Sequence, residues 1–280
     1  MARDGDPRPI GVFDSGVGGL TVLAELHRRL PGESTIYLGD NARTPYGPRP
    51  ADEVRRFTLD AVDWFLDQDV KLLVLACNTA TARALPDVRA RATVPVVGVV
   101  RPGAVAAAAA TRTRNVGVIA TAGTVESGAY HDAIVEADSA VAVAQLACPE
   151  LVPMVEAGIL DGRRAESVLR AYLEPLIADH AGMDTLLLGC THYPLLRGAI
   201  ESIVGDGVSV VDSAFTTALA VEDLLDALGS RAPRGAGVVH RVTTTGDVDA
   251  FVTIARSLFG DGLPVVESAT IEASAAVPVD

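Results

Sequence analysis

Two cysteines stand at equivalent points of a repeated sequence, within residues 72–81 and 186–194. Cys77 and Cys190 each close an apolar run of strand length and are followed by small or hydroxyl residues that can cap a helix. This strand-to-helix junction indicates an α/β fold. The thiol there meets backbone N–H groups and the positive end of a helix dipole, which favour the thiolate. A lone cysteine would more often be a buried structural residue, but the duplication favours two reactive thiols.

The repeat extends beyond the cysteines. Residues 10–15 are echoed by residues 116–121, and residues 94–100 by residues 208–214. We therefore predict an α/β chain with two similar doubly wound parallel-sheet domains that are related by a pseudo-twofold axis. If these domains face each other, the two thiols approach one substrate from opposite sides, and the active site lies in the cleft between the domains.

Apolar periodicity predicts strands that alternate with helices along the chain. Beyond the two cysteine runs, the expected strands are 10–13, 35–38, 116–119, 141–146, 208–211, 239–244 and 263–266. The loop at 41–50 is too rich in proline and glycine to be regular. The expected domains are residues 1–100 together with 212–268, residues 101–211, and a C-terminal tail at 269–280.

Polar side chains follow several of these predicted strands directly. They are Asp14, Ser15, Cys77, Asn78, Cys190 and Thr191. Parallel sheets covered by helices place their binding sites at the carboxyl ends of the strands. The sequence thus predicts one site that is assembled from several strand ends.

The composition limits the partners and the compartment. The 280 residues suffice for roughly two domains, and the net charge of −13, with arginines interspersed among acids, argues against nucleic acid. No apolar run approaches the ~20 residues of a membrane span, and the N-terminus is charged and unlike a signal peptide. We therefore expect no membrane partner and a cytoplasmic protein. An odd set of cysteines, Cys77, Cys148 and Cys190, predicts reduced thiols.

No cofactor and no metal are expected. The glycines after Asp14 imitate a dinucleotide-binding turn, but the sixth position counted from Gly16 is Thr21, and Asp14 would push a carboxylate toward a pyrophosphate. Pyridoxal phosphate needs a Schiff-base lysine, and the only lysine, Lys71, lies at the wrong end of its strand. A zinc site would have to use the three cysteines and His192, which lack the close paired spacing of zinc ligands.

Four motifs are shared with a known family. They are residues 14–20, 45–47, 76–80 and 189–195. In order and along essentially the whole chain, they resemble the aspartate/glutamate racemase family, and within it the bacterial glutamate racemases. Aspartate and hydantoin racemases share the two-cysteine plan but not this combination of flanking residues. The resemblance implies a cofactor-independent isomerase that interconverts L- and D-glutamate and supplies D-glutamate for peptidoglycan in the cell wall.

The resemblance also implies roles for individual residues. One cysteine thiolate removes the α-proton and the opposite thiol delivers a proton, with Cys77 serving the D-enantiomer and Cys190 the L-enantiomer. Asp14, His192 and Glu156 would assist the thiols. The implied substrate-binding set is Asp14, Ser15, Tyr46, Gly47, Asn78, Thr79, Thr191 and His192. Taken alone, Asp14 would be a helix N-cap, His192 a polar residue at a helix start, and Glu156 a solvated helix residue.

Two other functions stay open at this point. A racemase of a related acidic amino acid, aspartate, would use the same two thiols. A non-catalytic two-lobed ligand-binding protein would share the fold, although it does not require duplicated thiols. In each case the partner is a small molecule, and a homodimer is left open.

Overall fold

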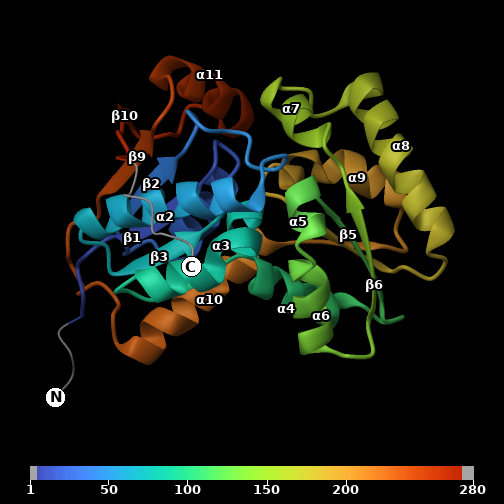
Figure 1. The fold of residues 1–280 in the computed structure, drawn as a ribbon, viewed down its shortest axis with the longest axis horizontal. Helices are drawn as coiled ribbons and strands as arrows, with labels where there is room; N and C mark the ends of the chain where they lie inside the picture. Colours follow the sequence, from blue (N-terminus) through green and yellow to red (C-terminus); the bar gives the residue numbers. More distant parts are fainter. Residues whose placement is uncertain (1–4, 273–280) are drawn as a thin grey trace.

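The computed structural model describes residues 5–272, which form two lobes, each built around a parallel β-sheet (Figure 1). The first sheet has the order β10-β9-β2-β1-β3-β4 and consists of β1 (Ile10–Asp14), β2 (Thr35–Gly39), β3 (Leu72–Leu75), β4 (Val96–Gly98), β9 (His240–Thr244) and β10 (Val266–Ser268). The second has the order β6-β5-β7-β8 and consists of β5 (Asn115–Ala120), β6 (Ala142–Ala147), β7 (Thr185–Gly189) and β8 (Ser209–Asp212). Neighbouring strands pair in parallel, so the strands of each sheet end at one edge.

The sequence repeat becomes a repeat of sheet positions. The echoed segments form β1 and β5, β3 and β7, and β4 and β8, and the order β2-β1-β3-β4 in the first sheet matches β6-β5-β7-β8 in the second. The helices that follow β4 and β8, α4 (Val100–Ala110) and α10 (Ser213–Leu228), pack against each other. The predicted fold of two similar doubly wound parallel-sheet lobes is confirmed.

Both faces of the first sheet are buried. Its helices are α1 (Leu20–Arg29), α2 (Ala51–Asp67), α3 (Asn78–Arg91), α10 and α11 (Val248–Phe259). Ile10 and Val12 of β1 pack with α1, α10 and α11, whereas Phe13 packs with α2 and α3, because successive residues of a strand face opposite sides of the sheet. A strand buried on both faces is apolar throughout, which is why the strands of this lobe show continuous apolar runs.

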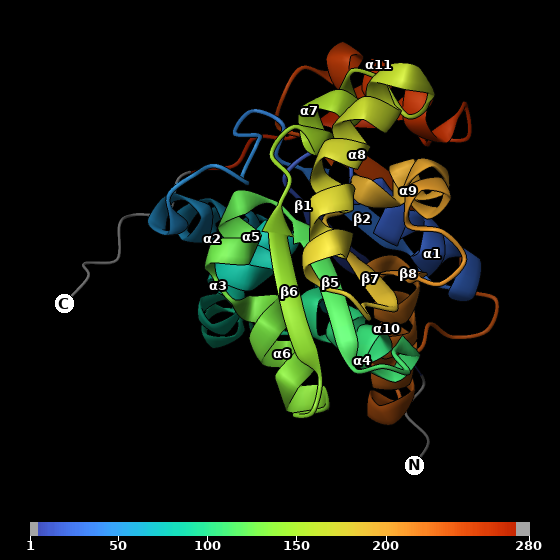
Figure 2. The same ribbon diagram turned by 90° about the vertical axis from the view of Figure 1, so that its right-hand side faces the viewer.

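The second sheet is covered in the same way, with α6 on one side and α8 on the other (Figure 2). The helices of this lobe are α4, α5 (Ala122–Glu126), α6 (Ala129–Ala137), α7 (Leu151–Glu156), α8 (Gly162–Asp179) and α9 (Arg197–Val204), the last preceded by a 3-10 turn at Tyr193–Leu196. Leu186 and Leu188 of β7 face the core formed with α7, α8 and α9, and Leu187 faces the core formed with α4 and α6. Each lobe is therefore a helix–sheet–helix sandwich.

The chain returns to the first sheet after the second lobe. β9 pairs with β2, and β10 pairs with β9. The strand expected at 263–266 is displaced to Val266–Ser268, because Pro264 has no N–H to donate to a sheet. The domain boundaries given above stay a prediction, and most of the predicted C-terminal tail, residues 273–280, lies outside the described residues.

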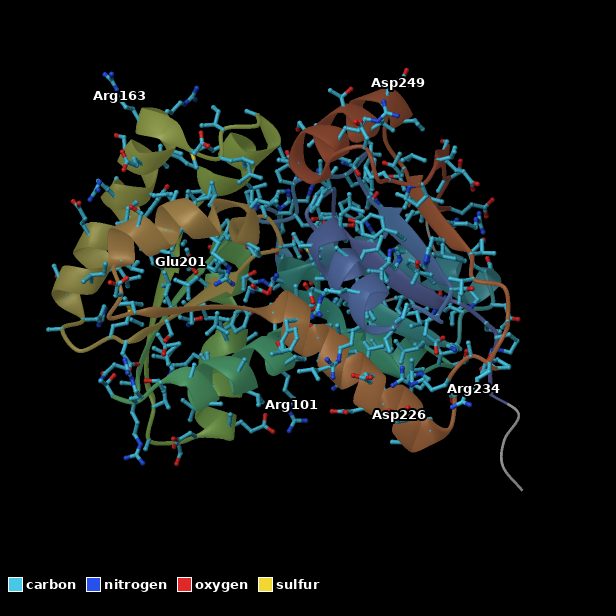
Figure 3. All side chains as sticks on the ribbon, turned by 180° about the vertical axis from the view of Figure 1, so that it is seen from behind. Arg101, Arg163, Glu201, Asp226, Arg234 and Asp249 are labelled. Carbon is cyan, nitrogen blue, oxygen red and sulfur yellow. The ribbon has the colours of Figure 1, made fainter. Side chains whose placement is uncertain are left out.

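Charges of both signs are mixed on the outer helices. Arg163, Glu201 and Asp226 point away from the ribbon (Figure 3). Arg197 pairs with Glu201, and Arg231 pairs with Asp226. These two arginines are thus tied to neighbouring acids. Between residues 5 and 272, no helix combines the length and the apolar character needed to span a membrane.

Candidate active site

The two cysteines of the repeat line one cavity between the lobes. Cys77 follows β3 and Cys190 follows β7, and the two residues are 5% and 6% exposed. The cavity volume is about 150 Å³, well below the ~300–1,000 Å³ of drug-sized ligand pockets, so it suits a small metabolite. Its wall consists of Ser15, Thr44, Pro45, Tyr46, Gly47, Pro48, Cys77 and Thr79 from the first lobe, and Thr121, Ala122, Cys148, Pro149, Val152, Pro153, Cys190, Thr191 and His192 from the second.

Cys77 caps the N-terminus of α3. Its Sγ accepts a hydrogen bond from the backbone N–H of Ala80 at 3.4 Å and lies 3.5 Å from the hydroxyl oxygen of Ser15. Burial, together with the nearby Asp14 carboxylate, raises the pKa of the Cys77 thiol to about 12. The helix N-terminus was expected to favour a thiolate here, but desolvation outweighs it. Cys77 therefore carries its proton at neutral pH.

A chain of contacts runs from Cys190 to Glu156. The Sγ of Cys190 lies 3.9 Å from His192 Nδ1, and His192 Nε2 lies 3.2 Å from Glu156 Oε1. Burial acts to lower the pKa of His192, but the bonds to Cys190 and Glu156 outweigh it and raise this pKa to about 10. His192 is thus an imidazolium at neutral pH and places a positive charge beside the Cys190 sulfur.

Asp14 lies fully buried behind the cavity wall, at the end of β1. Its Oδ2 accepts a hydrogen bond from the Gly16 N–H at 3.0 Å, and its Oδ1 accepts one from the Thr191 hydroxyl at 3.4 Å. Burial raises the pKa of this carboxyl, while the charge of His192 acts in the opposite direction. A Cβ on Gly18 would lie 2.5 Å from His192 Nδ1, so the glycine-rich turn permits close packing against the second lobe.

Most of the predicted substrate-binding residues reach the cavity. They are Ser15, Tyr46, Gly47, Thr79, Thr191 and His192. Asp14 and Asn78 lie behind the wall. The Oδ1 of Asn78 accepts a hydrogen bond from the Tyr130 hydroxyl at 2.5 Å, while its buried Nδ2 has no partner among residues 5–272. An unpaired buried donor is costly, and the predicted role of Asn78 would pair this amide with a substrate oxygen. Glu156 reaches the site through His192, and all of these functional roles stay predictions.

The wall also contains residues that the sequence analysis did not single out. Thr121 follows β5 as Ser15 follows β1, so the repeat itself offered a signal for it. The hydroxyls of Thr79 and Thr121 lie 2.9 Å apart and join the two lobes. Cys148 has no counterpart in the cysteine repeat, which indicates a packing residue. It is fully buried in the core of the second lobe, but it also lines the cavity, and no motif indicated this.

Two thiols that face one small cavity from two similar α/β lobes define the class of two-thiol racemases. Within the described residues, no group of three or more His, Cys, Asp or Glu side chains is arranged to hold a metal ion. The profile of the Asp/Glu/hydantoin racemase family matches residues 10–222. The chain belongs to this family.

Known proteins show the same likeness. The glutamate racemase of Oceanobacillus iheyensis is 48% identical over 252 residues, which cover 90% of this chain and 92% of that protein. The crystal structure of glutamate racemase isoform RacE1 from Bacillus anthracis has a TM-score of 0.90 and 40% identity, and covers 94% of this chain and 98% of that one. The glutamate racemase of Francisella tularensis, crystallised in complex with D-glutamate, has a TM-score of 0.88 and 31% identity over 95% of this chain and 99% of that one.

We expect Asp14→Asn and His192→Asn to affect the two directions of racemisation unequally. His192 contacts Cys190, whereas the charge of Asp14 acts on Cys77, and a positioned acid or base contributes ~10²- to 10⁴-fold. Because two enantiomers have equal free energy in solution, kcat/KM must stay equal in both directions. The asymmetry therefore appears in kcat and KM separately, and in the α-deuterium isotope effect measured from each enantiomer.

The pH profile checks the role of His192 independently. Its pKa is raised from 6.5 to about 10, so the imidazolium is present at neutral pH and is lost as the pH rises through about 10. We expect kcat/KM to fall there in the wild type, and this limb to be missing in His192→Asn. The stability that this group contributes to folding is likewise complete below pH 6.5 and lost through about pH 10. If Asp14→Asn and His192→Asn each lose a small and equal amount of activity in both directions, with unchanged pH profiles, the two residues act as helix-capping residues instead.

Proposed function

We propose that this chain is a glutamate racemase, which interconverts L- and D-glutamate by two-base proton transfer without a cofactor. The placement of Cys77 and Cys190 carries the proposal, because both thiols line one small cavity at equivalent strand ends of two similar lobes. The glutamate racemases that share 48% and 40% identity with the chain support glutamate as the substrate.

In the L-to-D direction, the thiolate of Cys190 takes the α-proton and Cys77 gives its proton to the opposite face. The Cα–H and Cys77 S–H bonds break, while the Cys190 S–H bond and a new Cα–H bond form. A pKa of about 12 keeps the proton on Cys77 until it is needed, and the His192 imidazolium stabilises the Cys190 thiolate. The D-to-L direction runs these steps in reverse. The assignment of Cys190 to the L-enantiomer rests on the family resemblance.

Substrate recognition in this proposal does not use an arginine or lysine clamp. The α-hydrogen is far less acidic than a thiol of pKa ~8.5, so the site must stabilise the negative charge that develops on the substrate. The cavity wall described above contains no lysine or arginine. Hydroxyls, the unpaired amide of Asn78 and the N-terminus of α3 are the donors that hold the carboxylates in this proposal. They act more strongly in an enclosed site than in water.

We extend the proposal to the cellular role. The family resemblance supports a cytoplasmic enzyme that supplies D-glutamate for peptidoglycan synthesis. A homodimer is compatible with this role, and sedimentation of the purified protein measures the assembly state directly.

Incubating metal-free protein with L-glutamate tests the activity. We expect optical rotation to decay to zero and chiral chromatography to show equal amounts of the two enantiomers. Aspartate is the specificity control, and faster turnover of aspartate would identify a racemase of that shorter acid. If the protein racemises neither glutamate nor aspartate, the proposal is wrong and a non-catalytic ligand-binding protein is the better interpretation.

A further inference from the structure

Part of the cavity wall comes from an irregular segment of the first lobe. Residues 41–50 connect β2 to α2 without forming a helix or strand, yet Tyr46, Gly47 and their neighbours line the cavity. A segment without a backbone ladder keeps its shape through its other contacts. These contacts therefore decide how this wall meets the substrate.

Many of the contacts converge on Asp40, a fully buried residue directly after β2. Its Oδ2 accepts hydrogen bonds from the Tyr46 hydroxyl at 2.5 Å and from Arg43 Nε at 2.6 Å, and its Oδ1 accepts one from the Thr245 hydroxyl at 2.7 Å. The Thr245 hydroxyl also accepts a hydrogen bond from the Ala42 N–H at 3.1 Å. Asp40 thus ties together the end of β2, the wall segment and the end of β9.

The ring of Tyr46 is held as firmly as its hydroxyl. Its centroid lies 6.2 Å from that of Phe13 and 5.8 Å from that of Phe57. Burial and the charge of Asp40 raise the pKa of Tyr46 far above its usual value, so the phenol remains a hydrogen-bond donor. Arg43 lies over the Phe57 ring at 4.4 Å and pairs with two buried carboxylates, Asp40 and Asp60. Few alternative arrangements of this cluster would keep all of its polar groups paired.

The same segment also touches the second lobe. The carbonyl of Gly47 accepts a hydrogen bond from the Gly123 N–H at 2.9 Å, and a Cβ on Gly47 would lie 2.9 Å from Thr121 Cβ. Glycine is therefore required at this close approach of the lobes. The placement of residues 41–50 consequently affects both the wall itself and the way the lobes meet over the cavity.

We propose that Asp40 is a positioning residue for substrate binding, because its buried carboxylate holds the Tyr46 hydroxyl and so fixes Tyr46 and Gly47 against the substrate. This inference rests on the proposed function. Asp40 does not line the cavity and takes no part in proton transfer. Loss of its bond to Tyr46 weakens ground-state and transition-state binding alike, so KM rises while kcat changes little.

Tyr46→Phe is the sharpest test, because it removes one hydroxyl and leaves the ring between its aromatic neighbours. A hydrogen bond to a charged acceptor is worth roughly tenfold or more in an equilibrium constant. We therefore expect KM for glutamate to rise roughly tenfold and kcat to change less than about threefold. Asp40→Asn should raise KM at least as much. An unchanged KM in Tyr46→Phe would overturn the positioning role.

Glu33→Gln is the matched control. Glu33 is 3% exposed, precedes β2 where Asp40 follows it, and pairs with the buried Lys71. Neutralising it removes an equally buried carboxylate from the opposite end of the same strand. We expect Glu33→Gln to have a lower Tm but an unchanged KM. If its KM rises as much as that of Asp40→Asn, the effect of Asp40 on KM reflects only its contribution to the stability of the fold.

The double variant Asp40→Asn/Tyr46→Phe tests whether the two substitutions raise KM through the same interaction or independently of each other. If Asp40 acts through Tyr46, the rise in KM does not exceed that of the larger single variant, whereas additive rises would contradict the proposal. Should Asp40→Asn fail to fold, Thr245→Val weakens the same cluster from its other side, and a raised KM is again expected.

Amide hydrogen exchange gives a readout that does not depend on catalysis. Without substrate, residues 41–50 should exchange faster in Tyr46→Phe and Asp40→Asn than in the wild type, and not in Glu33→Gln. This result would stand even if glutamate were not the substrate, so failure of this inference and failure of the proposed function are distinguishable. Unchanged exchange at residues 41–50 would overturn the inference.

Discussion

Cys77→Ala and Cys190→Ala are each expected to abolish racemisation, with kcat lowered by roughly 10⁴-fold or more, the upper end of what one positioned acid or base contributes. Each variant keeps one thiol, so one face of the substrate retains an acid or base and the opposite face has none. Proton removal without delivery to the other face returns the starting enantiomer. The measurement is the initial rate of D-glutamate formation from L-glutamate, and of the reverse reaction.

Cys148→Ala is the matched control for these variants. Cys148 is fully buried and lines the same cavity, and burial raises its pKa to about 12, the value reached at Cys77. Its Sγ, however, lies 3.8 Å from the carbonyl oxygen of Leu146, and it follows neither strand of the cysteine repeat. We expect this variant to remain active. A Cys77→Ala enzyme that racemises at a near wild-type rate would refute the two-base interpretation.

The fold was predictable because a parallel α/β repeat leaves a local signature in the sequence. Strands that are buried on both faces must be apolar throughout, so the runs before Cys77 and Cys190 stood out as strands. Their echoed neighbours then identified β1 with β5 and β4 with β8, and the two sheets place these pairs at equivalent positions.

The site was only partly predictable, because its electrostatics depend on residues far apart in the chain. The pKa of His192 depends on Glu156, 36 positions away, and the wall depends on a bond from Thr245 to Asp40 across 205 positions. Nothing near Cys77 in the sequence indicates that burial outweighs the helix N-terminus. These quantities are set by tertiary packing, which a local pattern does not contain.

The repeat places one thiol in each lobe, and the two thiols have different charged neighbours. Burial and Asp14 keep the proton on Cys77, whereas His192 presents a cation to Cys190. A two-base racemase must begin each turnover with one thiolate and one thiol. In the proposed reaction the proton held on Cys77 serves the L-to-D direction, and the D-to-L direction requires the two thiols to exchange protonation states first.

Heavy water distinguishes two fixed bases from one base that moves between faces. With separate thiols, the group that abstracts and the group that donates differ, and the donor carries solvent-derived deuterium on its sulfur. We therefore expect D-glutamate formed from L-glutamate to carry deuterium at the α-carbon from the earliest turnover, while unreacted L-glutamate stays largely protiated at low conversion. Mass spectrometry of the two enantiomers after chiral separation measures both quantities.

The starting enantiomer is the internal control for that experiment. Early deuteration of L-glutamate would mean that Cys190 removes and returns protons on its own face faster than Cys77 delivers one. The origin of the hydrogen in the product decides the mechanism, because a single mobile base would carry some of the original hydrogen across. Early D-glutamate that retains substantial substrate-derived hydrogen would count against separate faces for Cys77 and Cys190, even if the protein proved to be a racemase.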